Sequence, residues 1–346
     1  MRPLRIAMVS TPHLPTPPVG SGGTELVVGD LVAALVARGH EVVLFAHPGS
    51  LTTARLVSFP TVYQPPIGER FDWRELAHLA LALQHREAVD LVHNHCLAAA
   101  PVLAARLGLR ALSTLHYLHP LLRTVPDHPV VAISQHQRAR AAGLRVLATI
   151  HHGLDLRRYT PAARKGRYLL FLGRFSEKKG AEYAIAAARR LGLPLLLAAP
   201  PAPGNAYFET VIRPQLGGSI VYLGEVGGAE KSRLLAEALC LLMPVQWDEP
   251  FGLTAIEALA SGTPVVGLRR GALPEIVEEG VTGYLVETPD DLPGAVRRAL
   301  DLSPQRCRAA AEARFSVERM VAAYSDLYQR LSAAADTDAV RWAGGR

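Results

Sequence analysis

The sequence predicts an α/β protein built from two doubly wound parallel sheets in tandem. Short apolar runs rich in valine, leucine and isoleucine alternate with longer runs of helical apolar spacing, which is typical of βαβ units. The alternation pauses at a polar stretch, 154–167, and then restarts. A chain of 346 residues is long enough for two domains of ordinary size.

The first round of alternation covers residues 4–153. The expected strands are 4–10, 40–46, 89–95, 110–116, 130–134 and 147–153. The expected helices are 24–39, 73–87, 98–108 and 136–143. Gly39 is a natural C-cap for the first of these helices.

The second round begins after the polar stretch, which we interpret as a linker. The expected strands are 168–173, 194–200, 220–225, 239–245, 263–268 and 282–287. The expected helices are 180–192, 228–238, 251–260 and an amphipathic closing helix, 316–334. The tail from residue 336 onward is expected to fray.

Charge and cysteine content narrow the function classes. The net charge is +6, and the first 160 residues carry most of the excess, which suits phosphate-bearing ligands or an anionic membrane surface as well as an ordinary solvated surface. The sequence contains no stripe of basic and aromatic residues of the kind that would indicate nucleic-acid binding. Three isolated cysteines favour neither a disulfide framework nor a structural zinc site, and they make a reducing cytoplasm the default. Only four of the 37 basic residues are lysines.

A glycine-rich segment, "GSGGTE" (20–25), joins the first strand to the first helix. It nearly matches the dinucleotide pattern GxGxxG, but Glu25 stands at the sixth position. The second strand ends in Ala46 and His47 rather than in a ribose-binding acid, so an NAD site is disfavoured. The glycines would let backbone N–H groups approach an anion at the helix N-terminus, or they form an ordinary turn.

A second segment, "GRFSEKKG" (173–180), follows the first strand of the second domain. Arg174 lies just past the strand and Lys179 just before the next helix. Two cations at one strand end could hold a diphosphate, with the arginine forking two oxygens, or they could form a solvated charged turn.

The third segment is "WDEPFGLTAIEALASGTPVV" (247–266), with Glu249 at the mouth of a helix and Glu257 about two turns further along. At 100° per residue the two carboxylates would lie about 80° apart around a helix, so they are not a pair on one face. Carboxylates accept hydroxyl hydrogen bonds, which suits the hydroxyls of a sugar or a ribose. Two carboxylates that only interact with a helix dipole are the alternative.

Histidines also lie at a strand end. His93 and His95 share one strand face at a metal-compatible spacing, but a strand end predicts a polar rim, and we interpret them so rather than as a zinc site. The pair at 151–152 is interpreted as junction structure.

These motifs, in this order, resemble the retaining glycosyltransferases of family 4, which have the two-domain GT-B fold. "EPFGLTAIEALASGTPVV" resembles the E-x7-E signature, and "GSGGTE", "TLHY", "HHGLDLRRYTP", "GRFSEKKG" and "GALPEIVEEGVTGYLV" resemble the flanking family motifs, with His152 where asparagine is usual. The resemblance covers almost the whole chain. It implies two Rossmann-like domains that face a central cleft.

The resemblance also implies roles for matching residues. Arg174 and Lys179 would hold the donor diphosphate, Glu249 would bind the donor sugar, and His116 would lie near the transferred sugar. Further donor contacts are implied for Glu257, on the ribose hydroxyls, and for backbone groups at Gly22, Gly23, Phe251, Gly252 and Leu253.

Domain limits and partners follow from the same resemblance. We expect an acceptor domain at 1–158, a nucleotide-sugar-binding domain at 159–320, and a closing helix with a tail at 321–346 that crosses back to the first domain. The donor would be a UDP- or GDP-linked sugar, the acceptor a small molecule, a saccharide or a lipid, and no metal or cofactor would be needed. The expected location is the cytoplasm, with the inner membrane face as an additional contact.

Two other function classes remain open at this point. Sugar-nucleotide epimerases share the GT-B architecture and would consume donor without an acceptor. A non-catalytic nucleotide-sugar binder is the other alternative.

Overall fold

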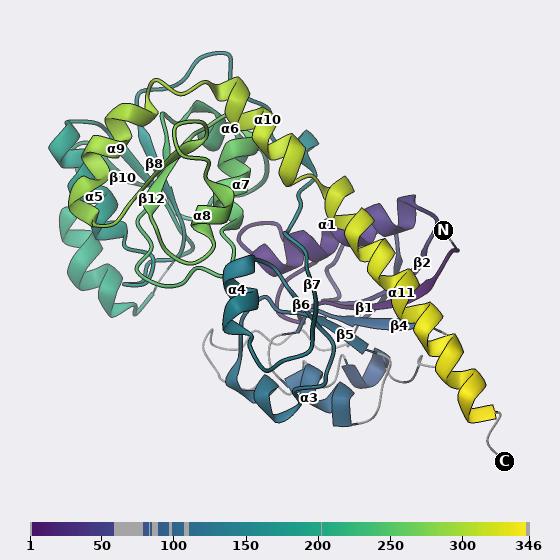
Figure 1. Cartoon of the computed structure of the whole chain (residues 1–346). Helices are drawn as coiled ribbons and strands as arrows, with labels where there is room; N and C mark the ends of the chain where they lie inside the picture. Colours follow the sequence, from purple (N-terminus) through teal and green to yellow (C-terminus); the bar gives the residue numbers. More distant parts are fainter. Residues whose placement is uncertain are drawn as a thin grey trace. The chain divides into compact units, whose positions relative to one another are not determined.

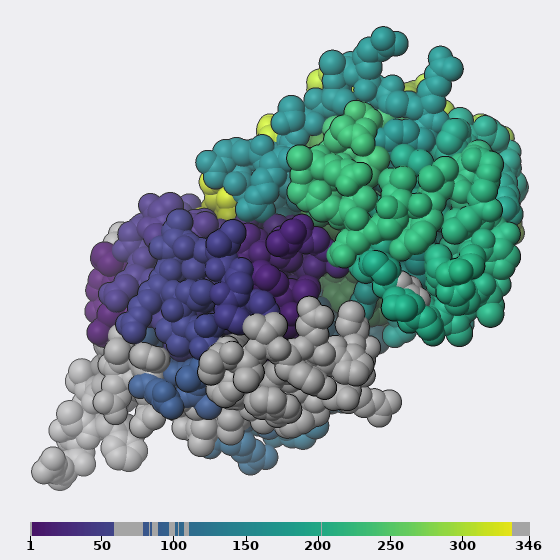
Figure 2. Space-filling model, turned by 180° about the vertical axis from the view of Figure 1, so that it is seen from behind, coloured from purple at the N-terminus to yellow at the C-terminus, as the bar shows by residue number. Residues whose placement is uncertain are grey.

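A computed structural model of the chain describes residues 2–58, 79–82, 84, 89–96, 99–106, 111–201 and 203–343, and the other residues are grey in Figures 1 and 2. The chain divides into two compact units. Unit 1 consists of residues 1–18, 22–153 and 317–346, and unit 2 consists of residues 19–21 and 154–316.

Unit 1 is built on a parallel sheet. Its described strands lie in the order β3-β2-β1-β4-β5-β6-β7. Their bounds are β1 Arg5–Val9, β2 Glu41–Phe45, β3 Arg55–Val57, β4 Leu91–Asn94, β5 Ala111–Thr114, β6 Val130–Ala132 and β7 Val146–Thr149. The strand order reverses between β1 and β4, and in open α/β sheets such a reversal marks the place where ligands bind.

Helices cover this sheet. They are α1 Gly23–Ala37, α3 Ala99–Arg106, the 3-10 turn η2 Pro120–Thr124, α4 Gln135–Arg140 and α11 Val317–Ala343. The last of these packs against α1 although almost 300 residues separate the two in the sequence (Figure 1). Tyr324 and Tyr328 of α11 are fully buried, so the C-terminal helix contributes to the core of unit 1.

Unit 2 repeats the architecture with a six-stranded parallel sheet in the order β10-β9-β8-β11-β12-β13. The strands are β8 Leu169–Leu172, β9 Leu195–Ala198, β10 Ile220–Tyr222, β11 Leu241–Met243, β12 Val265–Leu268 and β13 Gly283–Val286. Here the order reverses between β8 and β11. The loops that follow these two neighbouring strands therefore meet at one edge of the sheet.

Helices pack on both faces of this sheet (Figure 1). They are α5 Ala181–Leu191, α6 Gly228–Glu237, α7 Leu253–Ala260, α8 Leu273–Ile276, α9 Leu292–Ala299 and α10 Pro304–Arg314. Shorter helical turns are η3 Leu156–Arg158, η4 Phe208–Ile212, η5 Arg213–Gln215 and η6 Pro289–Asp291. Most residues inside the strands are buried, as expected for parallel strands covered on both faces, and the clearest exception is Val221 in the edge strand β10, which is 40% exposed.

The predicted fold class of two doubly wound sheets is confirmed, and each predicted strand corresponds to an observed one within a few residues. Strand β3 was not predicted, because three residues are too short to show a period. Helices α9 and α10 were not predicted either. Of the helix expected at 73–87, only residues 79–82 and 84 lie within the described residues, and they are helical.

The prediction that the tail frays from residue 336 is wrong for the residues that the structure describes. Helix α11 continues to Ala343. Neither proline nor glycine interrupts the sequence between 317 and 343, and alanine, the best helix former, is frequent there. The first helix-breaking residues after 317 are Gly344 and Gly345.

Two residue types are divided between the units. All 13 histidines lie at or before His152, in the part of the chain that forms unit 1. All four lysines, from Lys165 to Lys231, lie in unit 2. No helix within the described ranges is long and apolar enough to cross a membrane.

Candidate functional site

The loops after β8 and β11 meet at the reversal point of the unit 2 sheet. The backbone N–H of Gln246 donates to the carbonyl of Lys178 over 2.8 Å. Gly180, with φ +69°, brings the first loop against the carbonyl oxygen of Pro244, which a Cβ at this position would overlap. Backbone contacts thus hold the two loops together independently of their charged side chains.

This contact gives a stability prediction. Gly180→Ala should lower the free energy of unfolding by about 2–4 kcal/mol, because left-handed backbone and the clash with Pro244 add together. Gly192→Ala is the matched control, with φ +65° but nothing within 4 Å of the added Cβ, and it should cost only about 1 kcal/mol. Urea unfolding followed by circular dichroism measures both, and equal losses would contradict the proposed contact.

The ammonium group of Lys179 is paired with Glu249, with 2.6 Å between Nζ and Oε2. The indole Nε1 of Trp247 donates to the same oxygen over 2.8 Å. Glu249 Oε1 receives no hydrogen bond from any described residue. The backbone of Glu249 is held by Gly271, whose missing Cβ lets the two segments touch, and by Ala272 N–H, which donates to the Glu249 carbonyl. One carboxylate oxygen is therefore occupied, and the other is open.

Arg174 lies on the same loop as Lys179. Its side chain is exposed, and within the described residues it forms no ion pair. A guanidinium that is exposed beside a second cation is available to an anionic ligand.

Helix α7 begins shortly after Glu249, the partner of Lys179. Gly252 is its N-cap with φ +110°, and no side chain caps the first turn. The Phe251 side chain is buried and packs edge-to-face on Phe315. Uncapped N–H groups at Gly252 and Leu253 leave the helix N-terminus suited to an anion.

Glu257 lies further along α7 and has a second lysine partner. Lys231 Nζ lies 2.7 Å from Glu257 Oε1, and the hydroxyl of Tyr159 donates to the same oxygen over 2.8 Å. The Glu257 side chain is only 3% exposed. No described residue bonds its Oε2. Both glutamates of the motif thus have one oxygen held by a lysine and an aromatic donor.

In unit 1 the glycine loop turns tightly into α1. Gly22, with φ 151°, is the N-cap, and Gly23 is the first residue of the helix. Glu25 is buried, and it accepts a hydrogen bond from the hydroxyl of Thr11. Burial raises the pKa of Glu25, and the residue that breaks the dinucleotide pattern thus lies buried in the first turn of α1.

His116 follows β5 and is an inner member of a row of four histidine rings in unit 1. Its Nε2 lies 2.8 Å from Nδ1 of His95, and it stacks on His152 with ring centroids 5.1 Å apart. His95 in turn lies 3.4 Å from His93, measured from Nε2 to Nδ1. Burial lowers the pKa of His116 to about 4 and that of His93 to about 3, and it holds those of His95 and His152 well below the usual value. These rings are neutral at physiological pH.

The row ends on helix α11. The hydroxyl of Tyr328 lies 2.6 Å from Nδ1 of His93, and Thr114 bridges His93 Nε2 and the hydroxyl of Tyr324 at 2.8 and 2.7 Å. The described residues contain no group of three or more histidine, cysteine or acidic side chains arranged to hold a metal ion.

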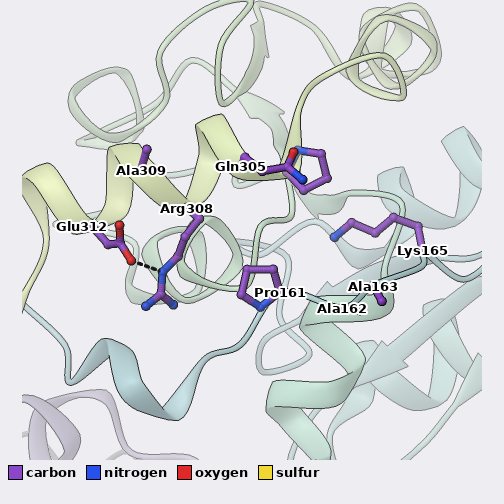
Figure 3. Close-up of a pocket in the computed structure, with 9 residues that line it drawn as sticks. Pro161, Ala162, Ala163, Lys165, Gln305, Arg308, Ala309 and Glu312 are labelled. Carbon is purple, nitrogen blue, oxygen red and sulfur yellow. Dashed lines mark hydrogen bonds and ion pairs between the residues drawn. The ribbon is translucent and has the colours of Figure 1, made fainter.

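A pocket of about 250 Å³ lies elsewhere in unit 2, between the linker and α10 (Figure 3). Its cations are already engaged. Lys165 Nζ donates to the Ala236 carbonyl and the Thr263 hydroxyl at 2.7 and 2.6 Å, and Arg308 pairs with Glu312 at 2.6 Å. We place no function in this pocket.

The structure therefore places all the residues that the sequence singled out in unit 2 on two adjoining loops and on α7: Arg174, Lys179, Glu249, Phe251, Gly252, Leu253 and, further along the helix, Glu257. His116, Gly22 and Gly23 lie in unit 1. Sequence reasoning missed Lys231, Tyr159 and Trp247. The scarcity of lysine was a usable signal for Lys231. Of the four lysines, Lys178 and Lys179 lie on the loop after β8, and Lys231 pairs with Glu257.

Comparisons with known proteins agree with this arrangement. The family described as "Glycosyl transferases group 1" matches residues 155–315, and the family described as "Glycosyltransferase Family 4" matches residues 21–191. A D-inositol 3-phosphate glycosyltransferase of Mycolicibacterium smegmatis is 31% identical over 297 residues, which cover 75% of this chain and 67% of that protein.

Solved structures show the same fold. AviGT4, a glycosyltransferase involved in avilamycin A biosynthesis, superposes with a TM-score of 0.75 and 30% identity over 96% of this chain and 98% of its own. A sucrose-phosphate synthase from Thermosynechococcus elongatus reaches a TM-score of 0.81 at 23% identity, covering 96% of this chain and all of its own. The predicted GT-B fold is confirmed by these similarities.

Proposed function

The chain belongs to glycosyltransferase family 4, and we propose that it transfers a sugar from a nucleoside diphosphate sugar to an acceptor hydroxyl with retention of the anomeric configuration. One observation carries the proposal. Glu249 and Glu257 each keep one carboxylate oxygen open while a lysine and an aromatic donor hold the other. Two open acceptors on one helix and its mouth suit the hydroxyls of the donor sugar and of the ribose.

The donor diphosphate would bind between Arg174, Lys179 and the N-terminus of α7. Arg174 can fork two phosphate oxygens, and the uncapped N–H groups at Gly252 and Leu253 add backbone donors. Lys179 is paired with Glu249 in the ligand-free chain. A bound diphosphate would therefore share this ammonium with the carboxylate, which links the phosphate and sugar sites.

Transfer would proceed on one face of the sugar. The bond from the anomeric carbon to the leaving phosphate oxygen breaks, the acceptor oxygen bonds to the same face, and the acceptor proton passes to the departing phosphate. Arg174 and Lys179 would stabilise the charge that develops on the diphosphate. We propose that neither metal nor cofactor is needed for this step. Trapping of a covalent glycosyl-enzyme would contradict this mechanism.

Unit 1 would supply the acceptor side. Gly22 and Gly23 would approach the phosphates with backbone N–H groups, and His116 would lie near the transferred sugar as a neutral hydrogen-bonding group, since its pKa is about 4. The acceptor is a small molecule, a saccharide or a lipid. One relative is named for D-inositol 3-phosphate, so a small polar acceptor of that type is the first to test.

A binding screen tests the proposal directly. UDP, GDP and ADP, with their glucose- and mannose-linked forms where available, should be titrated into the full chain by calorimetry. We expect one nucleotide to bind, and turnover of its sugar to depend on an acceptor. Failure of all three nucleotides to bind would overturn the proposal, and donor isomerisation without acceptor would indicate an epimerase instead.

The two glutamates should separate in function. Glu257→Ala should weaken binding of the nucleoside diphosphate about tenfold or more, the scale of a lost hydrogen bond to a charged group, whereas Glu249→Ala should mainly slow sugar transfer. Glu177→Ala is a matched control, since Glu177 is exposed on the loop that carries Lys179. Equal loss of nucleotide affinity in both variants would contradict the assignment.

A further inference from the structure

The buried carboxylate of Glu257 depends on a cation that the motif does not include. A carboxylate with 3% exposure is costly unless it is paired, and Lys231, which is 20% exposed, supplies the charge from α6. Without this lysine the buried charge would have no cationic partner. The carboxylate would then no longer be held in one orientation toward a ligand.

Two different elements hold the same oxygen. Lys231 from α6 and Tyr159 from the linker both bond to Oε1, at 2.7 and 2.8 Å. Two contacts to one oxygen, from separate directions, fix the orientation of the carboxylate. They leave Oε2, which no described residue bonds, as the acceptor for a ligand.

The position of Tyr159 is itself fixed. Arg308 on α10, drawn in Figure 3, donates to the carbonyls of Leu156 (3.1 Å) and Tyr159, which lie in the linker, and to that of Ala260 (2.8 Å), the last residue of α7. The guanidinium thereby ties the linker to the helix that carries Glu257. Tyr159 is only 3% exposed, so its side chain is enclosed by protein on nearly all sides.

We propose that Lys231, together with Tyr159, is a positioning residue that orients Glu257 Oε2 toward the ribose hydroxyls of the donor and so sets selectivity for ribonucleotides. This inference rests on the proposed function, because it takes the donor to be a nucleoside diphosphate sugar. Lys231 acts through Glu257 and need not touch the ligand.

The test compares ribonucleotides with nucleotides that lack the hydroxyls. Calorimetry on the full chain should measure the affinity of the nucleotide found among UDP, GDP and ADP, and of its 2′,3′-dideoxy form. Wild type should prefer the ribonucleotide about tenfold or more. Lys231→Met should lower ribonucleotide affinity about tenfold and leave dideoxynucleotide affinity nearly unchanged, so that the preference disappears.

Three further variants complete the design. Lys231→Arg should retain part of the preference, because the charge remains. Tyr159→Phe should lower it less than Lys231→Met, because only a neutral donor is lost. Arg233→Met is the matched control, since this exposed cation of the same helix pairs with Glu237 instead, and it should leave both affinities unchanged.

The outcomes are distinguishable. A preference that survives in Lys231→Met, or an equal loss for both nucleotides, would overturn the positioning role while the proposed function stands. A wild type that binds the ribonucleotide and the dideoxynucleotide equally would also overturn it, because Glu257 would then not bind the ribose hydroxyls. A wild type that binds none of the three nucleotides would overturn the proposed function, and the inference with it.

Discussion

Arg174→Ala should lower the turnover of the nucleotide sugar about a hundredfold or more, the scale of a lost group that stabilises developing charge. The expected reason is specific to this side chain. Lys179 shares its charge with Glu249 at 2.6 Å, whereas Arg174 is exposed and has no ion-pair partner among the described residues. In the proposed reaction the arginine would therefore bring an uncompensated positive charge to the leaving diphosphate.

The measurement is release of the nucleoside diphosphate from the donor that the binding screen identifies, under saturating donor. Arg174→Lys should recover part of the rate, because charge returns without the forked geometry. Arg297→Ala is a control, since this exposed arginine belongs to helix α9 and not to the loop that carries Arg174 and Lys179. An unchanged rate in Arg174→Ala would remove this residue from the site.

Mild acid should destabilise unit 1 and leave unit 2 unaffected. The pKa values of His93 and His116 are lowered by burial to about 3 and about 4, and those of His95 and His152 lie well below the usual value. Below pH 6.5 the unfolded chain binds protons that the folded unit cannot, so the free energy of unfolding falls as pH falls from 6.5 toward 4. A single histidine with the lowered pKa of His116 would cost about 2 kcal/mol between pH 7 and pH 5.

Hydrogen exchange at pH 7.5, 6 and 5, corrected for the intrinsic exchange rate, resolves the two units. Peptides from β4 and β5 should lose protection as pH falls, whereas peptides from β8 and β9 serve as an internal control, because unit 2 contains no histidine. Glu25 opposes the effect, since its raised pKa lets the folded state bind a proton first. It is one group against the four histidines of the row, and the lowered pKa values of His40, His47 and His128 add to the effect. Constant protection of β4 and β5 down to pH 5 would contradict the neutral buried state of these rings.

The fold was largely predictable because parallel strands buried on both faces appear as apolar runs. The apolar run 239–245, for instance, contains β11, and the polar residues from Gln246 onward indicate the loop that follows this strand. Strand β3 has three residues and only partial burial, so it gives no comparable signal. The length of α11 was underestimated because polar residues at 336–338 were interpreted as an end, although alanines continue the helix beyond them.

The site was predictable in its residue types but not in its pairings. Lys179 and Glu249 are 70 residues apart, and they meet only because β8 and β11 are neighbours in the sheet. Strand order is a tertiary property that periodicity does not report. The same holds for Lys231 and Tyr159, which reach Glu257 from two other elements.

The restriction of lysine to unit 2 has a practical consequence for handling the protein. Amine-directed reagents can react only at the N-terminus and at four side chains, of which Lys179 and Lys231 are bonded to the two glutamates of the motif. Immobilisation through amines, or labelling with an amine-reactive dye, would thus attach much of the probe beside the proposed donor site. Coupling through the C-terminus is the better choice for surface-based measurements, and the reactivity of these few amines offers a footprint of ligand occupancy.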